Sequence, residues 1–412
     1  MQRERSAAGA PLVVVGIGAD GWDGLSPRAR WVIEDADVLR GSTRQLGLVP
    51  AAVAAERVPW PSPMAPALAD LPDAYPGRRV VVLASGDPML SGVGTSLVRL
   101  HGPDAVAVVP HPSSVTLACA RMGWAVEETV VVSVVGRSLH LLTPHMTPGR
   151  RVLVLGSDGR APSAIAAHLT GLGYGPSRLT ALAQLGGPEE RAFHGTAAGW
   201  THEDTDPLVV TAVEVTADPD TVPLPTVPGL PDAAFDDDGQ LTKRDVRAVT
   251  LARLAPLPGQ LLWDVGAGAG SIAIEWMRTH PTCRAVAVES RPDRAARIRA
   301  NADRLGVPDL RVVEGRAPDA LAGLPIPDAV FVGGGATTPG VLETCWAALP
   351  VGGRLVANAV TVESEAVLAG WYARVGGELV RIGVQKAAPV GGFTGWKPAM
   401  PVTIWSVFRS DP

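Results

Sequence analysis

The sequence predicts two different α/β domains joined by a proline-rich segment. Strand-like apolar runs alternate with amphipathic segments along the chain, from VVVGIG and RVLVLGS to LLWDVG and DAVFVGGG, which is typical of parallel α/β folds. A chain of 412 residues is also too long for one ordinary core. Residues 218–232 read DPDTVPLPTVPGLPD, a composition that favours extended, semi-rigid chain. We therefore expect a first domain over 11–215, a linker over 216–232 and a second domain over 233–412.

The composition excludes several classes of protein. A formal net charge of −5 and an aromatic content of 5% argue against a nucleic-acid partner. No apolar run approaches the ~20 residues of a membrane span, and the N-terminus has no complete signal peptide. Cys119, Cys283 and Cys345 form no CxxC pair and are expected to be buried, reduced thiols, and no histidine has a metal-ligand spacing. We expect a cytoplasmic homo-oligomer with no metal, membrane or nucleic-acid partner.

The first half opens with GIGADG (Gly16–Gly21), which matches the G-x-G-x-x-G dinucleotide fingerprint literally. In that fingerprint the helix begins within the glycines. Here WDGL intervenes, and Ser26 followed by Pro27 has the pattern of a helix N-cap with proline at the first helical position. The pattern therefore argues against a dinucleotide site.

Two further loops follow strand-like runs in the first half. VVLAS leads into Gly86-Asp87-Pro88, and VVP leads into His111-Pro112-Ser113-Ser114. With GIGADG they make three strand-end loops rich in glycine and hydroxyl groups. Such loops meet at the carboxyl edge of a parallel sheet, so we expect one ligand cleft there.

The second half contains LLWDVGAGAGSIAIEW (Leu261–Trp276), in which an apolar strand, a glycine turn and a helix follow one another. This arrangement brings backbone N–H groups close to a polar ligand. Ser271 stands where a dinucleotide fingerprint has its third glycine, and Asp264 precedes the turn. The charged amino-acid end of S-adenosylmethionine needs close backbone approach and a carboxylate, which Asp264 could supply. Glu289, which ends the next strand, could accept hydrogen bonds from a ribose. D-x-G-x-G-x-G thus favours S-adenosylmethionine over a nucleotide cofactor.

The loop after DAVFV indicates what kind of group accepts the methyl. Enzymes that methylate an amino nitrogen of nucleic acid often carry an Asn/Asp-Pro-Pro-aromatic loop there, whereas this chain has Gly333-Gly334-Gly335. We expect a bulky acceptor that need not be an amine.

These motifs carry a resemblance. GIGADG, ASGDPMLSGVG and HPSSVTLACARMGW resemble the tetrapyrrole methylase family over roughly residues 11–215. LTKRDVRAVTLARLAPLPGQLLWDVGAGAGS, VVEGRAPDALAGLPIPDAVFVGGG and GGRLVANAV resemble the decarboxylating precorrin methyltransferases of class I fold over roughly 230–410. Their order in one chain is similar to the fused precorrin-6Y C5,15-methyltransferase family of cobalamin biosynthesis.

The resemblance implies a tetrapyrrole methylase fold followed by a Rossmann-like class I methyltransferase domain. It also implies one S-adenosylmethionine site in each domain, two per chain, and a precorrin tetrapyrrole as substrate. The first domain would methylate one meso carbon. The second would methylate the other and remove carbon dioxide from the ring C acetate. A reduced tetrapyrrole has electron-rich enamine carbons, so the protein's main task would be positioning and exclusion of water. The sequence identifies no catalytic general acid.

The resemblance also assigns cofactor contacts by position. Those in the second domain are Thr242, Gly266, Ala267, Gly268, Ala269, Gly270, Glu289 and Ala317. Asp264 is a further candidate, because its carboxylate could meet the amino-acid end of the donor. Those in the first are Gly16, Gly18, Asp87, Leu90, Ser113 and Ser114. Two positions depart from the family pattern: GIGADG replaces GxGPGD, and Arg316 stands where relatives often have the aspartate of GDAP. Arg316 cannot replace a carboxylate that holds the adenine amino group, although backbone contacts from Ala317 would persist.

Two groups of residues are candidates for substrate binding. Lys243, Arg244 and Arg247 could meet substrate carboxylates or form an ordinary solvated helix face. GGFTGWKPAMP (Gly391–Pro401) could be a lid that stacks Trp396, with Lys397 beside it, on the macrocycle, or a packed hairpin turn. Two alternative functions stay open: an NAD-dependent oxidoreductase that uses GIGADG with Asp37 on the ribose, and a tetrapyrrole-binding protein without turnover.

Overall fold

The computed structural model describes residues 12–411 and divides into two compact units. The first contains the described residues up to Arg137 together with Pro148–Thr221, and the second contains Ser138–Thr147 together with Val222–Pro412. The fold is mixed α/β in both. Within 12–411, no helix is long and apolar enough to cross a membrane.

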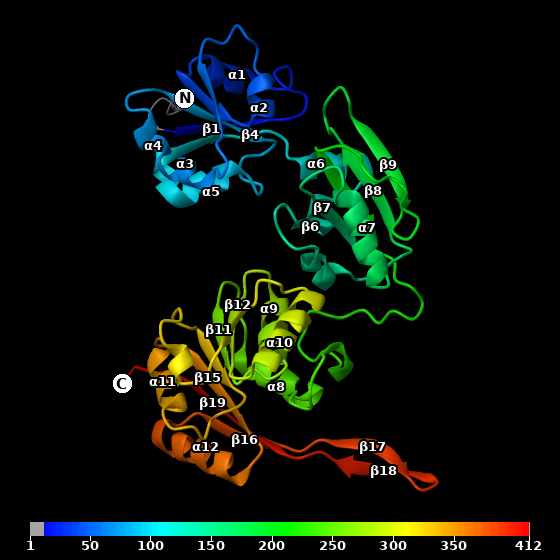
Figure 1. Cartoon of the computed structure of the whole chain (residues 1–412), viewed down its shortest axis with the longest axis vertical. Helices are drawn as coiled ribbons and strands as arrows, with labels where there is room; N and C mark the ends of the chain where they lie inside the picture. Colours follow the sequence, from blue (N-terminus) through cyan, green and yellow to red (C-terminus); the bar gives the residue numbers. More distant parts are fainter. Residues whose placement is uncertain (1–11, 412) are drawn as a thin grey trace, which may run out of the picture. The chain divides into compact units, whose positions relative to one another are not determined.

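The first unit begins with a parallel five-stranded sheet in the order β3-β2-β4-β1-β5. Its strands are β1 (Leu12–Ile17), β2 (Val38–Gly41), β3 (Glu56–Pro59), β4 (Val80–Ser85) and β5 (Val106–Val109). The helices are α1 (Pro27–Glu34), α2 (Thr43–Gly47), α3 (Ala65–Ala69), α4 (Leu71–Ala74) and α5 (Val93–His101). α1 and α2 bury one face and α3, α4 and α5 the other (Figure 1). Burial of both faces explains the continuous valine runs.

A second five-stranded sheet completes the first unit in the order β6-β7-β10-β8-β9. Its strands are β6 (Thr129–Ser133), β7 (Arg151–Leu155), β8 (Arg178–Ala183), β9 (Arg191–Thr196) and β10 (Val209–Glu214), with helices α6 (Ser114–Met122) and α7 (Ala161–Gly171). Only β6 and β7 pair in parallel. The expectation of parallel architecture throughout this half is therefore wrong for β7 to β10. β8 and β9 are joined by a short turn, which permits only antiparallel pairing.

The second unit is built on a seven-stranded sheet in the order β13-β12-β11-β14-β15-β19-β16. Its strands are β11 (Leu261–Val265), β12 (Arg284–Glu289), β13 (Arg311–Glu314), β14 (Ala329–Val332), β15 (Arg354–Ala359), β16 (Glu378–Ile382) and β19 (Val402–Phe408). β19 runs antiparallel to both its neighbours, and the other pairs are parallel. The class I methyltransferase expectation is confirmed in this sheet with its covering helices.

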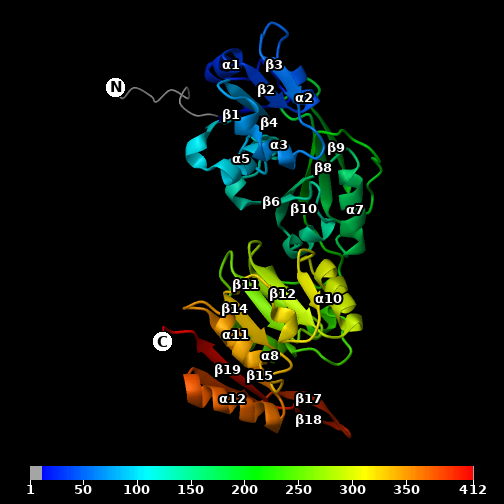
Figure 2. The same cartoon turned by 60° about the vertical axis from the view of Figure 1, so that its left-hand side comes forward.

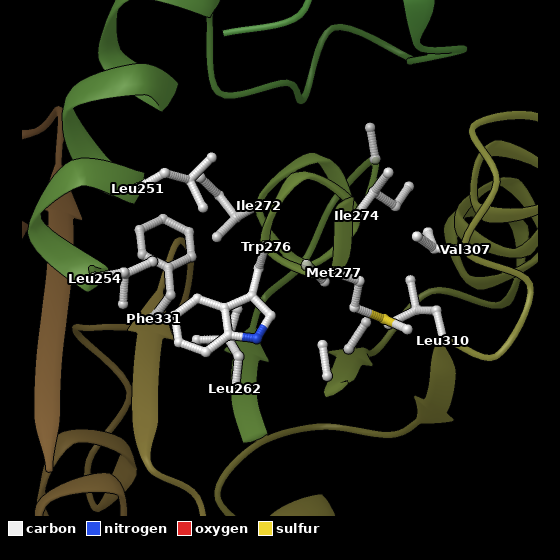
Figure 3. Packing of buried hydrophobic residues seen from close by; sticks show 14 of the residues in the cluster. Leu251, Leu254, Leu262, Ile272, Ile274, Trp276, Met277, Val307, Leu310 and Phe331 are labelled. Carbon is white, nitrogen blue, oxygen red and sulfur yellow. The ribbon is translucent and has the colours of Figure 1, made fainter. Parts of the chain in front are cut away.

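Helices cover both faces of this sheet (Figure 2). They are α8 (Arg244–Leu254), α9 (Ser271–Thr279), α10 (Pro292–Arg304), α11 (Val341–Ala348) and α12 (Val362–Val375). α8, α9 and α10 contribute to one hydrophobic core, and α11 and α12 contribute to a second core. Figure 3 shows Trp276 of α9 in the first core, beside Leu262 and Phe331. Its Nε1 donates to the carbonyl of Arg284 at 3.0 Å, so the buried indole is satisfied. Short 3₁₀ turns lie at Pro103–Ala105, Val126–Glu128, Leu139–His145, Asp232–Ala234 and Asp319–Leu321.

The segment Gly391–Pro401 contains the turn and the second strand of a hairpin formed by β17 (Gln385–Val390) and β18 (Phe393–Pro398), which pair with each other and with no other strand in 12–411. Figure 1 and Figure 2 show the hairpin extending from the second unit. Phe393 is 85% exposed and Trp396 is 72% exposed, so a packed turn is the wrong interpretation of these rings.

The proline-rich segment differs from the expected linker in its second half. Leu230 is fully buried in the core of the second unit. The side chain of Arg278 donates to the carbonyls of Leu224 and Pro225 at 3.0 and 3.2 Å. Residues 222–232 therefore pack as part of the second unit, because their backbone groups find buried partners there.

Candidate functional site

The glycine turn after β11 is fixed by its backbone and by its neighbours. Gly266, Gly268 and Gly270 have φ of +71°, +60° and +77°, which L side chains rarely adopt. A Cβ on Gly268 would lie 2.8 Å from the carbonyl oxygen of Gln240, and one on Gly266 would lie 2.8 Å from the backbone of Gly334. Three chain segments thus meet at this turn too closely for any side chain.

A cavity of about 870 Å³ opens beside the turn in the second unit. It is bordered by the carboxyl ends of β11, β12 and β14 and by the approach to α8. The predicted contacts that line it are Thr242, Lys243, Gly266, Ala267, Gly268, Glu289 and Ala317. Gln240 and Arg294 also line it, although no sequence motif marks them. Asp264, Ala269, Gly270, Arg244, Arg247, Trp396 and Lys397 are not on the cavity wall.

Glu289 lies at the end of β12 and is 4% exposed. Its carboxylate accepts hydrogen bonds from the backbone N–H groups of Gly268 at 2.9 Å and Arg291 at 3.0 Å. These bonds hold the carboxylate at the cavity wall. Each oxygen keeps further lone-pair capacity, which a ligand with two hydroxyl donors could use.

Asp264 is 1% exposed. Its Oδ2 accepts from the N–H of Ala273 in the first turn of α9 at 3.0 Å, whereas Oδ1 has no hydrogen-bond partner among the described residues. Burial raises the pKa of this carboxyl to about 7, and the charge of Glu289 adds to the rise. In this structure the carboxylate fixes the turn to α9 and does not reach the cavity.

The raised pKa of Asp264 makes the stability of the second unit depend on pH. The ordinary value is 3.8 and the folded value is about 7, so as pH rises the unfolded chain releases this proton first. Ionisation then favours unfolding, so the contribution of this carboxyl to stability falls from about pH 4 to about pH 7. D264N has no carboxyl to ionise at this position. Its free energy of unfolding should therefore rise relative to that of the wild type between about pH 4 and about pH 7. Urea unfolding of both proteins at about pH 5 and pH 8 tests this, and a constant difference would contradict it.

Four cationic side chains border the cavity. Arg294 is bonded to Asp238 at 2.8 Å, and Lys386 lies 3.9 Å from Asp245. Lys243 and Arg316 are exposed and form no ion pair with another residue in 12–411. These two charges are free to meet an anionic ligand.

Arg247 corrects the sequence analysis, which placed it on a solvated helix face or against substrate carboxylates. It is fully buried. Its Nε donates to Glu275 at 2.6 Å, and its other nitrogens reach Asp232 and the carbonyls of Thr242 and Leu230. Arg244 is exposed but lies off the cavity, and its backbone N–H donates to Asp232. Of Lys243, Arg244 and Arg247, only Lys243 therefore faces the cavity.

In the first unit, three loops meet at the carboxyl ends of the adjacent strands β4, β1 and β5. A Cβ on Gly16 would lie 2.2 Å from the carbonyl oxygen of Gly86 and 2.8 Å from the Cβ of His111. His111 Nε2 lies 3.2 Å from Asp20 Oδ1, a pair that the sequence analysis did not find. The structure thus brings the three predicted loops together.

The other predicted residues of this edge have local roles. Ser113 caps α6 by accepting from the N–H of Thr116 at 3.0 Å, and Ser114 begins that helix. Asp87 accepts from the N–H of Met89 at 2.8 Å. Gly18 follows β1, and a Cβ there would lie 2.7 Å from His111 Nε2, while Leu90 packs against the core around α6. α1 begins at Pro27 with Ser26 as its N-cap, as predicted.

The dinucleotide alternative conflicts with this sheet. Asp37 precedes β2, so it lies at the amino edge of the sheet, whereas GIGADG begins in the last two residues of β1 and lies at the carboxyl edge. The carboxylate of Asp37 accepts a hydrogen bond from the N–H of Arg79 at 2.7 Å, and this bond lowers the pKa of Asp37. One ligand cannot span both edges of the sheet in the way that a Rossmann site requires.

Comparison with known proteins agrees with the two-part organisation. Residues 11–200 match the family described as tetrapyrrole (corrin/porphyrin) methylases, and residues 233–409 match the precorrin methyltransferase domain. The chain is 51% identical over 395 residues to a precorrin-6Y C(5,15)-methyltransferase [decarboxylating] of Sinorhizobium sp. The match covers 96% of this chain and 95% of that protein. The chain belongs to the family of decarboxylating precorrin-6Y C(5,15)-methyltransferases.

Two other members of this family are also similar to the chain. A precorrin-6Y C(5,15)-methyltransferase [decarboxylating] of Mycobacterium tuberculosis is 50% identical over 403 residues, 97% of this chain and 100% of that protein. The crystal structure of the C-terminal domain of a Rhodobacter capsulatus precorrin-6Y C5,15-methyltransferase is 47% identical and covers 45% of this chain and 100% of that chain, with a TM-score of 0.43.

Proposed function

We propose that the chain uses S-adenosylmethionine to methylate precorrin-6Y at carbons 5 and 15 and releases the ring C acetate carboxyl as carbon dioxide, giving precorrin-8X in cobalamin biosynthesis. The observation that carries this proposal is the match to decarboxylating precorrin-6Y C(5,15)-methyltransferases over nearly the whole of both chains. A cytoplasmic location and a homo-oligomeric state are further parts of the proposal.

The residues of the second unit fit a methyl donor. The glycine turn lines the cavity, and the carboxylate of Glu289 is held at the same wall. We assign the glycine turn to the donor's amino-acid end, Glu289 to its ribose, and Thr242 and Ala317 to its remaining contacts. Bound there, the donor would supply an electrophilic methyl group. Lys243 and Arg316 would hold carboxylates of the macrocycle.

The reaction needs little general acid or base catalysis from the side chains of the protein. An enamine carbon of the reduced macrocycle is nucleophilic, and the conjugated ring can accept the electron pair of the C–C bond that breaks when carbon dioxide leaves. The chain's contribution is then to orient the macrocycle and to exclude water from the cavity. Transfer of label from a methyl-labelled donor to precorrin-6Y tests this activity, and a tetrapyrrole-binding protein would transfer none.

The first unit is proposed as a second donor site, with Gly16, Gly18, Asp87, Leu90, Ser113 and Ser114 near the donor. Calorimetric titration of the intact chain with S-adenosylhomocysteine should therefore give a stoichiometry of about two, since two separate glycine-loop sites bind independently. A stoichiometry of one would remove the first unit from the proposal.

The hairpin of β17 and β18 is proposed as a contact for the macrocycle. Lys386 and Met400, at its base, line the cavity, and the ring of Trp396 is exposed. An exposed indole can stack on a flat conjugated ligand, and Lys397 adds a charge beside it.

Trp396→Ala should raise the KM for precorrin-6Y several-fold without loss of stability, because the exposed ring packs little within the chain. Steady-state kinetics on W396A tests this. Trp31→Ala is the matched control, because Trp31 is also exposed, at 53%, but lies on α1 in the first unit. Equal KM values for W396A and wild type would exclude the hairpin from substrate binding.

A further inference from the structure

Residues Gly239–Lys243 form a short segment, here called the pocket strap, that crosses the glycine turn before α8 begins. All five residues line the cavity. The carbonyl oxygen of Gln240 lies 2.8 Å from the position that a Cβ on Gly268 would take. The strap contains no regular secondary structure, so contacts with neighbouring residues hold it in place.

Side chains from three helices fix the strap and the residues before it. Arg294 of α10 donates to Asp238 at 2.8 Å. Asn301 of α10 accepts from the N–H of Asp236 and donates to its carbonyl, both at 2.9 Å. At the other end of the strap, Arg247 of α8 donates to the carbonyl of Thr242, and Glu275 of α9 holds the guanidinium.

The contacts of Arg247 differ from those of an isolated buried ion pair. One nitrogen pairs with Glu275, and the other two reach the carbonyls of Thr242 and Leu230 and the carboxylate of Asp232. Glu275 in turn accepts from the N–H groups of Gly229 and Leu230 at 2.6 and 3.0 Å. The pair therefore ties two irregular segments to α8 and α9, and one of these segments is the cavity wall.

We infer that Arg247 is a positioning residue for the methyl donor of the second unit, acting through the pocket strap. It does not line the cavity, so its influence passes through the backbone of Thr242. This inference rests on the proposal that the cavity binds the donor. It assigns to the buried pair a role in donor affinity in addition to folding.

A lysine at this position separates the two roles. Lysine keeps the positive charge beside Glu275, but its single ammonium group cannot reproduce the planar fork that reaches both carbonyls. Arg247→Lys therefore leaves the buried charge paired and releases the strap. Arg253→Lys is the matched control, because Arg253 lies on the same helix and pairs with Glu378, which is 71% exposed in its side chain.

The experiment measures R247K, R253K and wild type as full chains. S-adenosylhomocysteine binding is followed by calorimetry, turnover by carbon dioxide release, and strap mobility by hydrogen exchange of Gly239–Lys243. In R247K we expect about tenfold weaker binding at one of the two sites and a similar rise in the KM for S-adenosylmethionine, from loss of a charged hydrogen bond. We expect faster exchange in the strap and an unchanged kcat, with R253K like wild type.

The following results would overturn the inference about Arg247. Wild-type donor affinity and strap exchange in R247K would overturn the inference and leave the proposed function intact. A wild-type chain that binds no donor in the second unit would overturn both. If R247K does not fold, E275Q replaces it: glutamine keeps one acceptor oxygen in place of two, for the N–H of Gly229 or of Leu230, and removes the charge that orients Arg247. Donor affinity in E275Q equal to that of wild type would again overturn the inference.

Discussion

Glu275→Ala should destabilise the second unit by about 3–5 kcal/mol, the cost of breaking a buried ion pair by removing one partner. Glu275 is 1% exposed and Arg247 is fully buried, so water cannot replace the lost carboxylate. The N–H groups of Gly229 and Leu230 also lose their acceptor. Urea unfolding followed by circular dichroism measures the change.

Glu378→Ala is the matched control for this substitution. Glu378 pairs with Arg253 of the same helix α8, but its side chain is 71% exposed. Removing an exposed pair should cost less than about 1 kcal/mol. Equal losses in E275A and E378A would mean that the buried network does not hold residues 229–247 to α9.

Gly268→Val should weaken donor binding in the second unit by at least ~2 kcal/mol, the scale of a buried clash or a lost hydrogen bond. Gly268 has φ of +60°, and its N–H donates to Glu289. A valine Cβ would meet the carbonyl of Gln240 at 2.8 Å, so either the turn or the pocket strap must move. Decarboxylation and the methylation in this unit should fail together, while the methylation in the first unit persists.

Gly259→Val controls for backbone strain alone. Gly259 has φ of +85°, but a Cβ there meets nothing within 4 Å and the residue is not on the cavity wall. G259V should lose stability and keep donor affinity. A folded G268V that binds donor and forms product at the wild-type rate would show that this turn is not the donor site.

Much of the second unit was predictable because its signals are local. The strand, glycine turn and helix around Gly268 follow one another in the sequence, and Glu289 ends the next strand. Ser26 and Pro27 likewise mark the start of α1 by rules that concern only neighbouring residues. Positions near a turn or cap carry their own conformational requirements, so one sequence suffices to place them.

Where the sequence interpretation differed from the structure, distant partners decided the outcome. Arg247 has the spacing of an exposed helix residue, and its burial is explained by partners elsewhere in the chain, among them Glu275, 28 residues away. The proline-rich residues 222–232 have the composition of a linker, but their N–H and carbonyl groups bind the side chains of Glu275 and Arg278 on α9. The pairing direction of β7 to β10 also depends on strand order, which hydrophobic patterns do not encode.

The most direct test of the account is the mass of the product formed from precorrin-6Y by the purified chain with excess S-adenosylmethionine. The account predicts a product that has gained two methyl groups and lost one carbon dioxide, and G268V should give a product with one added methyl and the carboxyl retained. A wild-type product that retains the carboxyl, or that gains no methyl group, would contradict the assignment of both reactions to this chain.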